Sequence, residues 1–236
     1  MTALMVRLIA CAFFVLAGCA HAAGPASIAA SYAVTMNGLH VADIQESYRA
    51  EGGSYRLTSR STPVGVLALV RKLAVRFVST GAVTDEGLQP QRFEGRRATG
   101  EIPEVVADFD WQSQRLALTH EGRQEDFALR PGTQDRLSVM YQFMFLAPDA
   151  SDTIEVDVMN GRRVERYTYT VTRDVAQDTP LGRLDTVHLV KRREPGDPQN
   201  EIWLSPEHAY LPVRMTIVER NGTRYEQLIT SLDLRP

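Results

Sequence analysis

The chain has 236 residues, and its 26 basic residues against 29 acidic ones give a net charge of −3. This length suffices for one sizeable domain or two small ones. A slightly acidic chain with scattered arginines lacks the basic surface that nucleic-acid binding requires, which excludes nucleic acid as a partner.

The first 22 residues have the three-part layout of a bacterial secretion signal. Arg7 supplies a positive start, and residues 8–17 form an apolar run that ends in small residues. The run is too short to cross a bilayer as a helix, and no later stretch is apolar enough to do so. We therefore expect an exported protein that works in the periplasm.

Two cleavage sites follow the apolar run. Residues 16–19 resemble the lipobox of bacterial lipoproteins, in which Cys19 would receive a diacylglycerol and residues 1–18 would be removed. Residues 20–22 instead form an A-x-A site, which would remove residues 1–22 and release a free protein. We favour the lipobox slightly. Because Ala20 is not the aspartate that resembles an inner-membrane retention signal, Cys19 would then anchor the protein to the outer membrane.

Both cysteines, Cys11 and Cys19, lie in or at the end of this leader. The mature protein should therefore contain no disulfide and no thiol nucleophile. Its stability must come from a packed core, although its expected compartment favours disulfides.

From residue 30 onward, apolar and polar residues alternate with a period of two, which is typical of strands with one buried face. Asn-Gly pairs between such runs favour tight hairpin turns. Many strands joined by short turns indicate an antiparallel meander, either a two-sheet sandwich or a curled barrel. We expect a single mainly β domain over residues 30–236, with the meander curled into an open or incomplete barrel. The clearest alternating runs are residues 105–111, 154–158 and 213–217, and the Asn-Gly pairs are at 37–38, 160–161 and 221–222.

Two segments depart from the alternation and predict short helices packed on or inside the sheet. Thr62 and Pro63 suit an N-cap and a first helical position, and residues 64–70 behind them are apolar on every side. Such a helix cannot lie on a wet surface, so it is buried in the sheet's curve or faces lipid or a ligand. The second helix is predicted over residues 132–146, with Thr133 or Asp135 as its cap.

The sequence lacks the short motifs of known catalytic sites, including those of serine hydrolases, zinc proteases and nucleotide-binding loops. Its five histidines are isolated from one another, so we expect neither a metal nor a cofactor. The pairs Asp108 with Asp110 and Glu155 with Asp157 lie opposite apolar residues, which indicates a solvated face more than an acid–base pair. Capping explains Asp135 without catalysis. We therefore predict that the protein is not an enzyme.

The predicted helices supply more apolar surface than a modest sheet needs as a lid. Their side chains can line a pocket or groove for a lipid, a glycan or a protein segment, although plain core packing would explain the same stripe. The alternatives are a structural or assembly factor that uses a surface patch or sheet edge, and a hydrolase of envelope polymers that uses Asp108 or Asp135. The pocket candidates are Val66, Leu67, Val70, Met140 and Met144.

Four local patterns occur together between residues 30 and 234. They are Gly87-Leu88-Gln89-Pro90 with Phe93; Gln134-Asp135 ahead of Ser138 and Tyr141-Gln142; Asp178-Thr179-Pro180-Leu181-Gly182 with Thr186-Val187; and Trp203 with Leu211-Pro212-Val213-Arg214. In this order they resemble the DUF3108 family of exported bacterial proteins, which has no assigned function. The resemblance implies a periplasmic, β-rich domain and carries over no catalytic residue. We also expect a likeness to the incomplete barrels of lipoprotein carriers, which bind acyl chains, but this likeness concerns the fold and does not determine function.

Overall fold

The computed structural model describes residues 24–69, 74–97 and 103–236. The predicted leader, with Cys19, lies outside the described residues, and so does Val70. The strands are β1 (Ser27–Met36), β2 (Leu39–Glu51), β3 (Ser54–Pro63), β4 (Val75–Thr84), β5 (Gly87–Arg97), β6 (Val105–Asp110), β7 (Arg115–His120), β8 (Arg123–Ala128), β9 (Gln134–Asp135), β10 (Thr153–Met159), β11 (Val164–Thr179), β12 (Gly182–Lys191), β13 (Gln199–Ser205), β14 (Leu211–Val218) and β15 (Arg224–Arg235). The helical segments are α1 (Ser138–Leu146) and the 3₁₀ turns η1 (Gly65–Leu69), η3 (Pro148–Ala150) and η4 (Pro206–His208).

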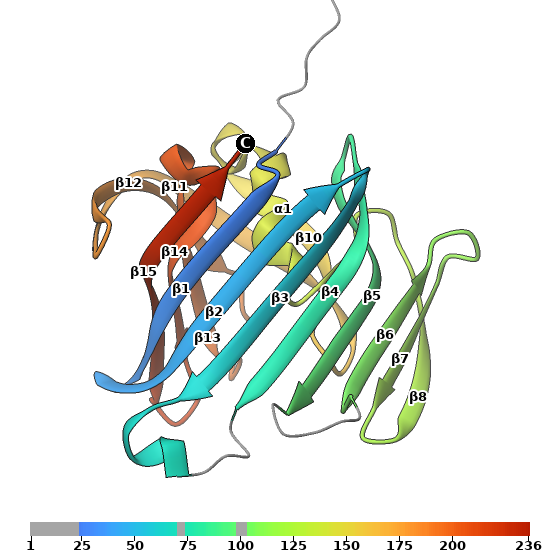
Figure 1. The fold of residues 1–236 in the computed structure, drawn as a ribbon, viewed down its shortest axis with the longest axis horizontal. Helices are drawn as coiled ribbons and strands as arrows, with labels where there is room; N and C mark the ends of the chain where they lie inside the picture. The colour runs from blue at the N-terminus through green and yellow to red at the C-terminus, as the bar shows by residue number, and fades with distance from the viewer. Residues whose placement is uncertain (1–23, 70–73, 98–102) are drawn as a thin grey trace, which may run out of the picture.

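All fifteen strands belong to one sheet, in the order β8-β7-β6-β5-β4-β3-β2-β1-β15-β14-β13-β12-β11-β10-β9. β1 pairs with both β2 and β15, which joins the two halves of the meander edge to edge. The sheet curls into a barrel wall (Figure 1), and its edge strands, β8 and β9, are not paired with each other. The predicted open or incomplete barrel is confirmed, and the alternative of a two-sheet sandwich is wrong.

The open seam of the barrel is bridged by side chains. Gln134 of β9 donates a hydrogen bond from Nε2 to the carbonyl oxygen of Leu88 in β5, at 2.7 Å. The sheet continues past this contact as β6 to β8, and their apolar residues join one core cluster with Met159 and Val164 from the other side of the seam. The barrel is therefore closed by packing and side-chain hydrogen bonds and not by a backbone ladder.

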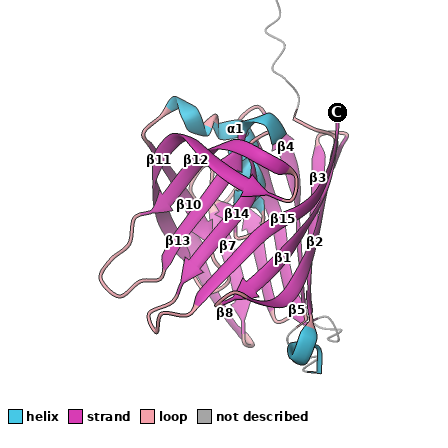
Figure 2. Ribbon diagram, turned by 90° about the vertical axis from the view of Figure 1, so that its left-hand side faces the viewer, coloured by secondary structure: helices cyan, strands magenta, loops and turns pink. Residues whose placement is uncertain are grey.

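Helix α1 lies within the curve of the sheet (Figures 1 and 2). Tyr141 stacks on Tyr48 of β2, with 5.7 Å between ring centroids, and Phe143 meets Tyr169 of β11 edge-on at 6.0 Å. Isolated helices of this length are marginal in water. Contacts with both halves of the wall therefore stabilise α1, as the prediction of a helix inside the sheet requires.

The first predicted helix is wrong. Thr62 and Pro63 end β3, and the chain then forms only the short turn η1. Thr62 stands opposite Asp43 of β2, so strand pairing outweighs the local preference for a helix start. The turn is also not buried inside the sheet, since Leu69 is 87% exposed.

The second predicted helix is confirmed over its carboxyl-terminal part, but it begins at Ser138 and not at residue 132. The segment before it contains the short strand β9, which pairs with β10. Asp135, and not Thr133, accepts the backbone N–H groups of Leu137 and Ser138, both at 2.8 Å. In the part of the chain that the structure describes, no helix is long and apolar enough to cross a membrane.

Candidate functional site

A pocket of about 330 Å³ lies inside the barrel, between the start of α1 and the wall. Its volume lies at the lower end of the range for small-molecule sites, about 300–1,000 Å³, and far exceeds the roughly 30 Å³ of one water molecule. Nine of its lining residues are apolar, and eight carry a polar or charged group. The lining residues are Ile44, Phe77, Leu137, Val139, Met140, Val158, Pro212, Met215 and Ile217, with Tyr32, Glu46, Ser59, Arg136, Asn160, Tyr167, Asn200 and Gln227.

The pocket lies toward the end of the barrel at which the β10–β11 and β14–β15 hairpins turn. Asn160 belongs to the turn between β10 and β11. Ile217 stands opposite Tyr225, close to the turn between β14 and β15. The other half of the interior is filled by α1 and the aromatic residues around it, so the helix forms the inner boundary of the pocket.

Arg136 is the one basic residue among the pocket's lining. Its side chain lines the pocket, and the residue is exposed to solvent. Its Cζ atom lies 4.6 Å from the centre of the Phe77 ring, a cation–π contact. Burial lowers the pKa of Arg136, while nearby Tyr167 and Asp135 raise it, and no side-chain hydrogen bond to a described residue contributes. A guanidinium remains charged in proteins, so its N–H donors are available to a ligand in the pocket.

Glu46 is a second polar point in the pocket. The hydroxyl of Tyr141 donates to its Oε2 atom at 3.0 Å. Burial raises the pKa of Glu46, and hydrogen bonds from Ser59 and Tyr141 oppose that rise. The phenol of Tyr32 is occupied by its own hydrogen bond to the carbonyl oxygen of Pro212, at 3.1 Å. Glu46 is thus held by its neighbours, whereas Arg136 is free to meet a ligand.

Glu46→Gln is expected to raise the free energy of unfolding at high pH, on the order of 1 kcal/mol, and to flatten its dependence on pH. Because the folded-state pKa of Glu46 lies above its unfolded value, the folded chain binds more protons between the two values. Stability therefore falls as pH rises through that window. An amide lacks the cost of a buried charge and still accepts the Tyr141 hydroxyl. Urea unfolding at about pH 5 and about pH 8 measures both effects.

The matched control is Glu125→Gln, because Glu125 is exposed on β8. It should leave the pH dependence unchanged. A Glu46→Gln protein less stable than the wild type at high pH would contradict the assignment of a costly buried carboxylate.

Asp135 fixes the start of α1 to the barrel wall. Its Oδ2 atom accepts the Ser79 hydroxyl of β4 at 2.5 Å, and its Oδ1 atom accepts the two N–H groups that begin the helix. Tyr55 of β3 bonds to the same Ser79 hydroxyl at 2.9 Å. Burial raises the pKa of Asp135, and these hydrogen bonds lower it. Asp135 is a buried capping group beside the pocket, and its contacts place the neighbouring Arg136.

Gln142 fixes the helix at a second point. Its Oε1 atom accepts the backbone N–H of Leu88 at 2.7 Å, and its Nε2 atom donates to the carbonyl oxygen of Glu86 at 2.8 Å. Gly87 has a φ of +106°, which favours glycine, and a Cβ atom there would also displace the Gln142 amide, 2.5 Å away. Two of the four local patterns, around residues 87–90 and 134–142, therefore meet in space and hold α1 against β5.

The five pocket candidates from the sequence are spread over three places. Met140 lines the pocket, whereas Met144 packs against the core cluster beside it. Leu67 is half-buried in η1 and does not line the pocket. Val66 lies in the same turn, but its side chain is outside the description, as is all of Val70.

Two of the carboxylates considered for catalysis, Asp108 and Asp157, are engaged by arginines. Asp108 is exposed and accepts Nη1 of Arg92 at 2.5 Å, as expected of a solvated face. Asp157 is buried, which contradicts that expectation, because Arg166 opposite it on β11 covers it with hydrogen bonds of 3.0 and 2.9 Å. Among the described residues, no three His, Cys, Asp or Glu side chains are grouped to hold a metal ion.

The fold is similar to that of known structures. A beta-barrel-like protein of the DUF1849 family from Brucella abortus superimposes with a TM-score of 0.57 at 12% identity, covering 90% of this chain and 99% of the other. A protein from Parabacteroides distasonis, provisionally described as a lipoprotein, gives a TM-score of 0.35 at 9% identity, covering 89% and 95%. The first match shows a shared fold, and the second is too weak to carry an argument.

A search among curated proteins finds no match. The family model described as "Protein of unknown function (DUF3108)" matches residues 31–229, which is most of the chain. The four local patterns lie within this span, and two of them hold the helix beside the pocket. The chain therefore belongs to the DUF3108 family.

Proposed function

We propose that this protein is a non-enzymatic binding module of the cell envelope, and that its interior pocket holds an amphipathic molecule with an anionic group. The apolar part of the ligand would lie against Met140, Met215 and Ile217, and its anionic group would meet Arg136. Binding sites of this kind combine an apolar lining with a few placed polar groups.

The observation that carries the proposal is the unpaired guanidinium of Arg136 inside the barrel. The residue is accessible to solvent, and no hydrogen bond or ion pair with a described side chain occupies its donors. A carboxylate or phosphate would supply the missing acceptors, and arginine binds both with two parallel hydrogen bonds. The pocket therefore favours an anionic amphiphile over a neutral oil.

The lining does not favour catalysis. The carboxyl of Glu46 is held by Tyr141, and Asp135 is occupied by capping α1. The hydroxyls beside them, Ser59 and Ser79, donate hydrogen bonds to these carboxylates, and no histidine among the described residues lines the pocket to serve as a base. We keep the interpretation that the protein binds and does not convert its ligand.

The proposed location rests on the leader over residues 1–22 or 1–18. We propose export to the periplasm, with anchoring to the outer membrane through Cys19. Mass measurement of the mature amino terminus tests both points: a diacylated Cys19 supports the anchor, and a free terminus at Ala23 contradicts it.

A partner that adds a strand at the sheet edge is disfavoured by the edges themselves. Edge strand β8 carries Arg123, Glu125 and Asp126, and charged side chains on an edge oppose pairing with another chain. The other edge strand, β9, has only two residues and lies against β5.

Arg136→Gln is expected to weaken binding of a fluorescent long-chain fatty acid by about 10- to 100-fold, because it removes charge-assisted hydrogen bonds worth about 1.5–3 kcal/mol. The methyl ester of the same fatty acid should bind wild type and variant alike. Fluorescence titration of both probes measures this discrimination.

The control is Arg183→Gln, which removes the same charge from an exposed position on β12. It should bind the acid as the wild type does. Equal affinity of wild type and Arg136→Gln for the acid would contradict the assigned role of Arg136.

A further inference from the structure

Six arginines lie on the outer surface of four neighbouring strands, β2 to β5, in a chain whose net charge is negative. We call this surface the arginine face. Its members alternate with inward-facing core residues such as Leu57 and Phe93, so the pleat of the sheet directs them all outward. They are Arg49, Arg56, Arg60, Arg76, Arg92 and Arg96.

Several of these arginines stand directly opposite one another. The register places Arg60 of β3 beside Arg76 of β4, and Arg76 beside Arg96 of β5. Arg49 of β2 is likewise opposite Arg56 of β3. Like charges in directly opposed positions destabilise a sheet. The folded chain thus bears a cost that an external anion would remove.

The arginine face is only partly neutralised by the chain itself. Glu94 pairs with Arg92 and Arg96, and Asp108 also pairs with Arg92, so the β5 side has partners. Over β2 to β4, the outward carboxylate of Asp43 binds His40, and Glu51 lies exposed at the end of β2. Within the described residues, the other four arginines have no carboxylate within ion-pair distance.

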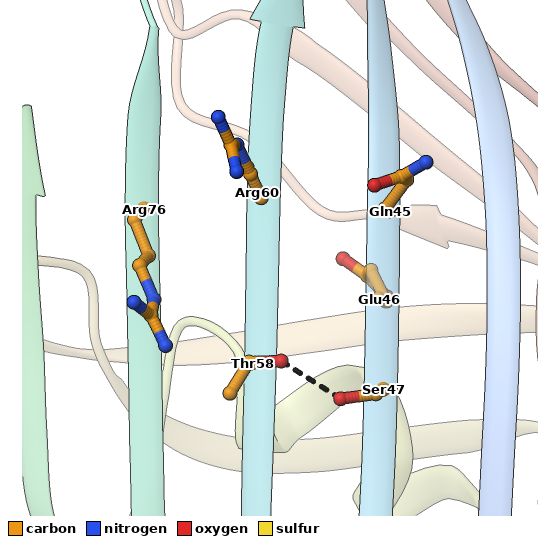
Figure 3. A pocket seen from close by; sticks show the side chains of 6 residues that line it. All are labelled: Gln45, Glu46, Ser47, Thr58, Arg60 and Arg76. Carbon is orange, nitrogen blue, oxygen red and sulfur yellow. Dashed lines mark hydrogen bonds between the residues drawn. The ribbon is translucent and has the colours of Figure 1, made fainter. Parts of the chain in front are cut away.

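Two shallow depressions mark the same surface. One, of about 440 Å³, is lined by Arg60 and Arg76 (Figure 3). Ser47 and Thr58, whose hydroxyls lie 2.8 Å apart, also line it, as do Gln45 and Glu46. The second, of about 250 Å³, adjoins it and shares Arg76. The face therefore offers guanidinium and hydroxyl donors on one surface, the groups that recognise phosphate.

Exposed apolar side chains lie at one end of the arginine face. Leu69 is in η1, which joins the two strands that carry Arg60 and Arg76, and Leu39 begins β2 at the same end, with 60% of its surface exposed. Surface leucines beside a basic face are typical of proteins that lie on a membrane interface.

We propose that the arginine face docks on an anionic phospholipid surface, with its arginines on lipid phosphates and with Leu39 and Leu69 entering the headgroup region. The positive charge of the arginine face would suit an acidic protein partner equally well, but the exposed leucines at the edge of the face favour a membrane. This surface lies on the outside of the barrel, so the inference does not depend on the proposed pocket ligand.

Vesicle flotation tests the docking surface. The exported chain carrying Cys19→Ala, which cannot be lipidated, is mixed with vesicles that contain phosphatidylglycerol or with vesicles of phosphatidylcholine alone. We expect binding to the anionic vesicles only, and its loss at high salt. Arg60→Gln with Arg76→Gln should weaken binding at least about tenfold, because each basic residue near an anionic surface contributes on the order of a fivefold increase in binding.

The matched control, Arg183→Gln with Arg192→Gln, removes the same charge from exposed positions on and next to β12 and should bind as the parent chain does. Leu39→Ser with Leu69→Ser should weaken binding but leave its salt dependence. Equal losses in the two arginine pairs would overturn the proposal. Binding of an acidic peptide but of no vesicle would also overturn it, in favour of a protein partner.

Discussion

Asp135→Ala is expected to lower the free energy of unfolding by about 3–5 kcal/mol, since buried donors left without an acceptor cost about 1–3 kcal/mol each. The change leaves the Ser79 hydroxyl and two backbone N–H groups at the start of α1 without their acceptor. It also releases the helix from β4. Denaturant unfolding followed by far-UV circular dichroism measures the loss.

Asp135→Asn is the matched control. Its carbonyl oxygen can accept the two N–H groups, and its amide can donate to Ser79, so we expect less than half of the loss caused by alanine. Asparagine also removes a carboxyl whose pKa is raised by burial, so its disadvantage should be smallest at high pH. If alanine and asparagine destabilised the chain equally, loss of the Asp135 hydrogen bonds would not be the cause of the destabilisation.

Gly81→Ala is expected to destabilise the barrel by at least about 3 kcal/mol, as overpacking against a rigid neighbour does. A Cβ atom at position 81 would lie 2.1 Å from the carbonyl oxygen of Gln89, and 2.8 Å from both the Cα atom of Pro90 and the Tyr55 ring. The first two are backbone atoms, at a bulge in the pairing of β4 with β5, and they cannot move aside alone.

Gly95→Ala tests whether the clash and not the loss of glycine matters. Its Cβ atom would meet the Phe77 side chain at 3.0 Å, which can shift, and Val105 at an ordinary contact distance of 3.6 Å. Thermal unfolding should therefore rank Gly81→Ala well below Gly95→Ala in stability. The reverse order would show that the bulge has room to relax.

Most of the barrel could be predicted because its signals are local. The alternation over residues 105–111 gave strand β6, and each Asn-Gly pair marks a turn between neighbouring strands. Elements held by distant contacts could not be predicted. Strand β9 exists because Gln134 and Asp135 stand beside Val158 and Met159 of β10, and no local pattern indicates that pairing. Residues 64–69 failed as a helix because β3 extends to Pro63 by pairing with β2.

The candidate site was predictable only in part. The apolar spacing of the second predicted helix correctly indicated that Met140 lines the pocket. The same reasoning predicted pocket residues within 64–70, but Leu69 in this segment is exposed. No sequence pattern indicated that Arg136 lines a pocket, because a single arginine before a helix is usually solvated. A sequence pattern did indicate Glu46. This residue falls between Ile44 and Tyr48 in the inward phase of β2, where a carboxylate is unexpected. A charged residue on the apolar phase of a strand is the pattern to look for in related chains.

Native mass spectrometry of protein isolated from cells without denaturation tests the central claim most directly. We predict that the wild-type protein carries an anionic amphiphile in its interior pocket. Met215→Trp, which fills the pocket, should lose this added mass, whereas Gln112→Trp in the exposed turn between β6 and β7 should keep it. A wild-type protein without any ligand, or an added mass that survives Met215→Trp, would contradict the account.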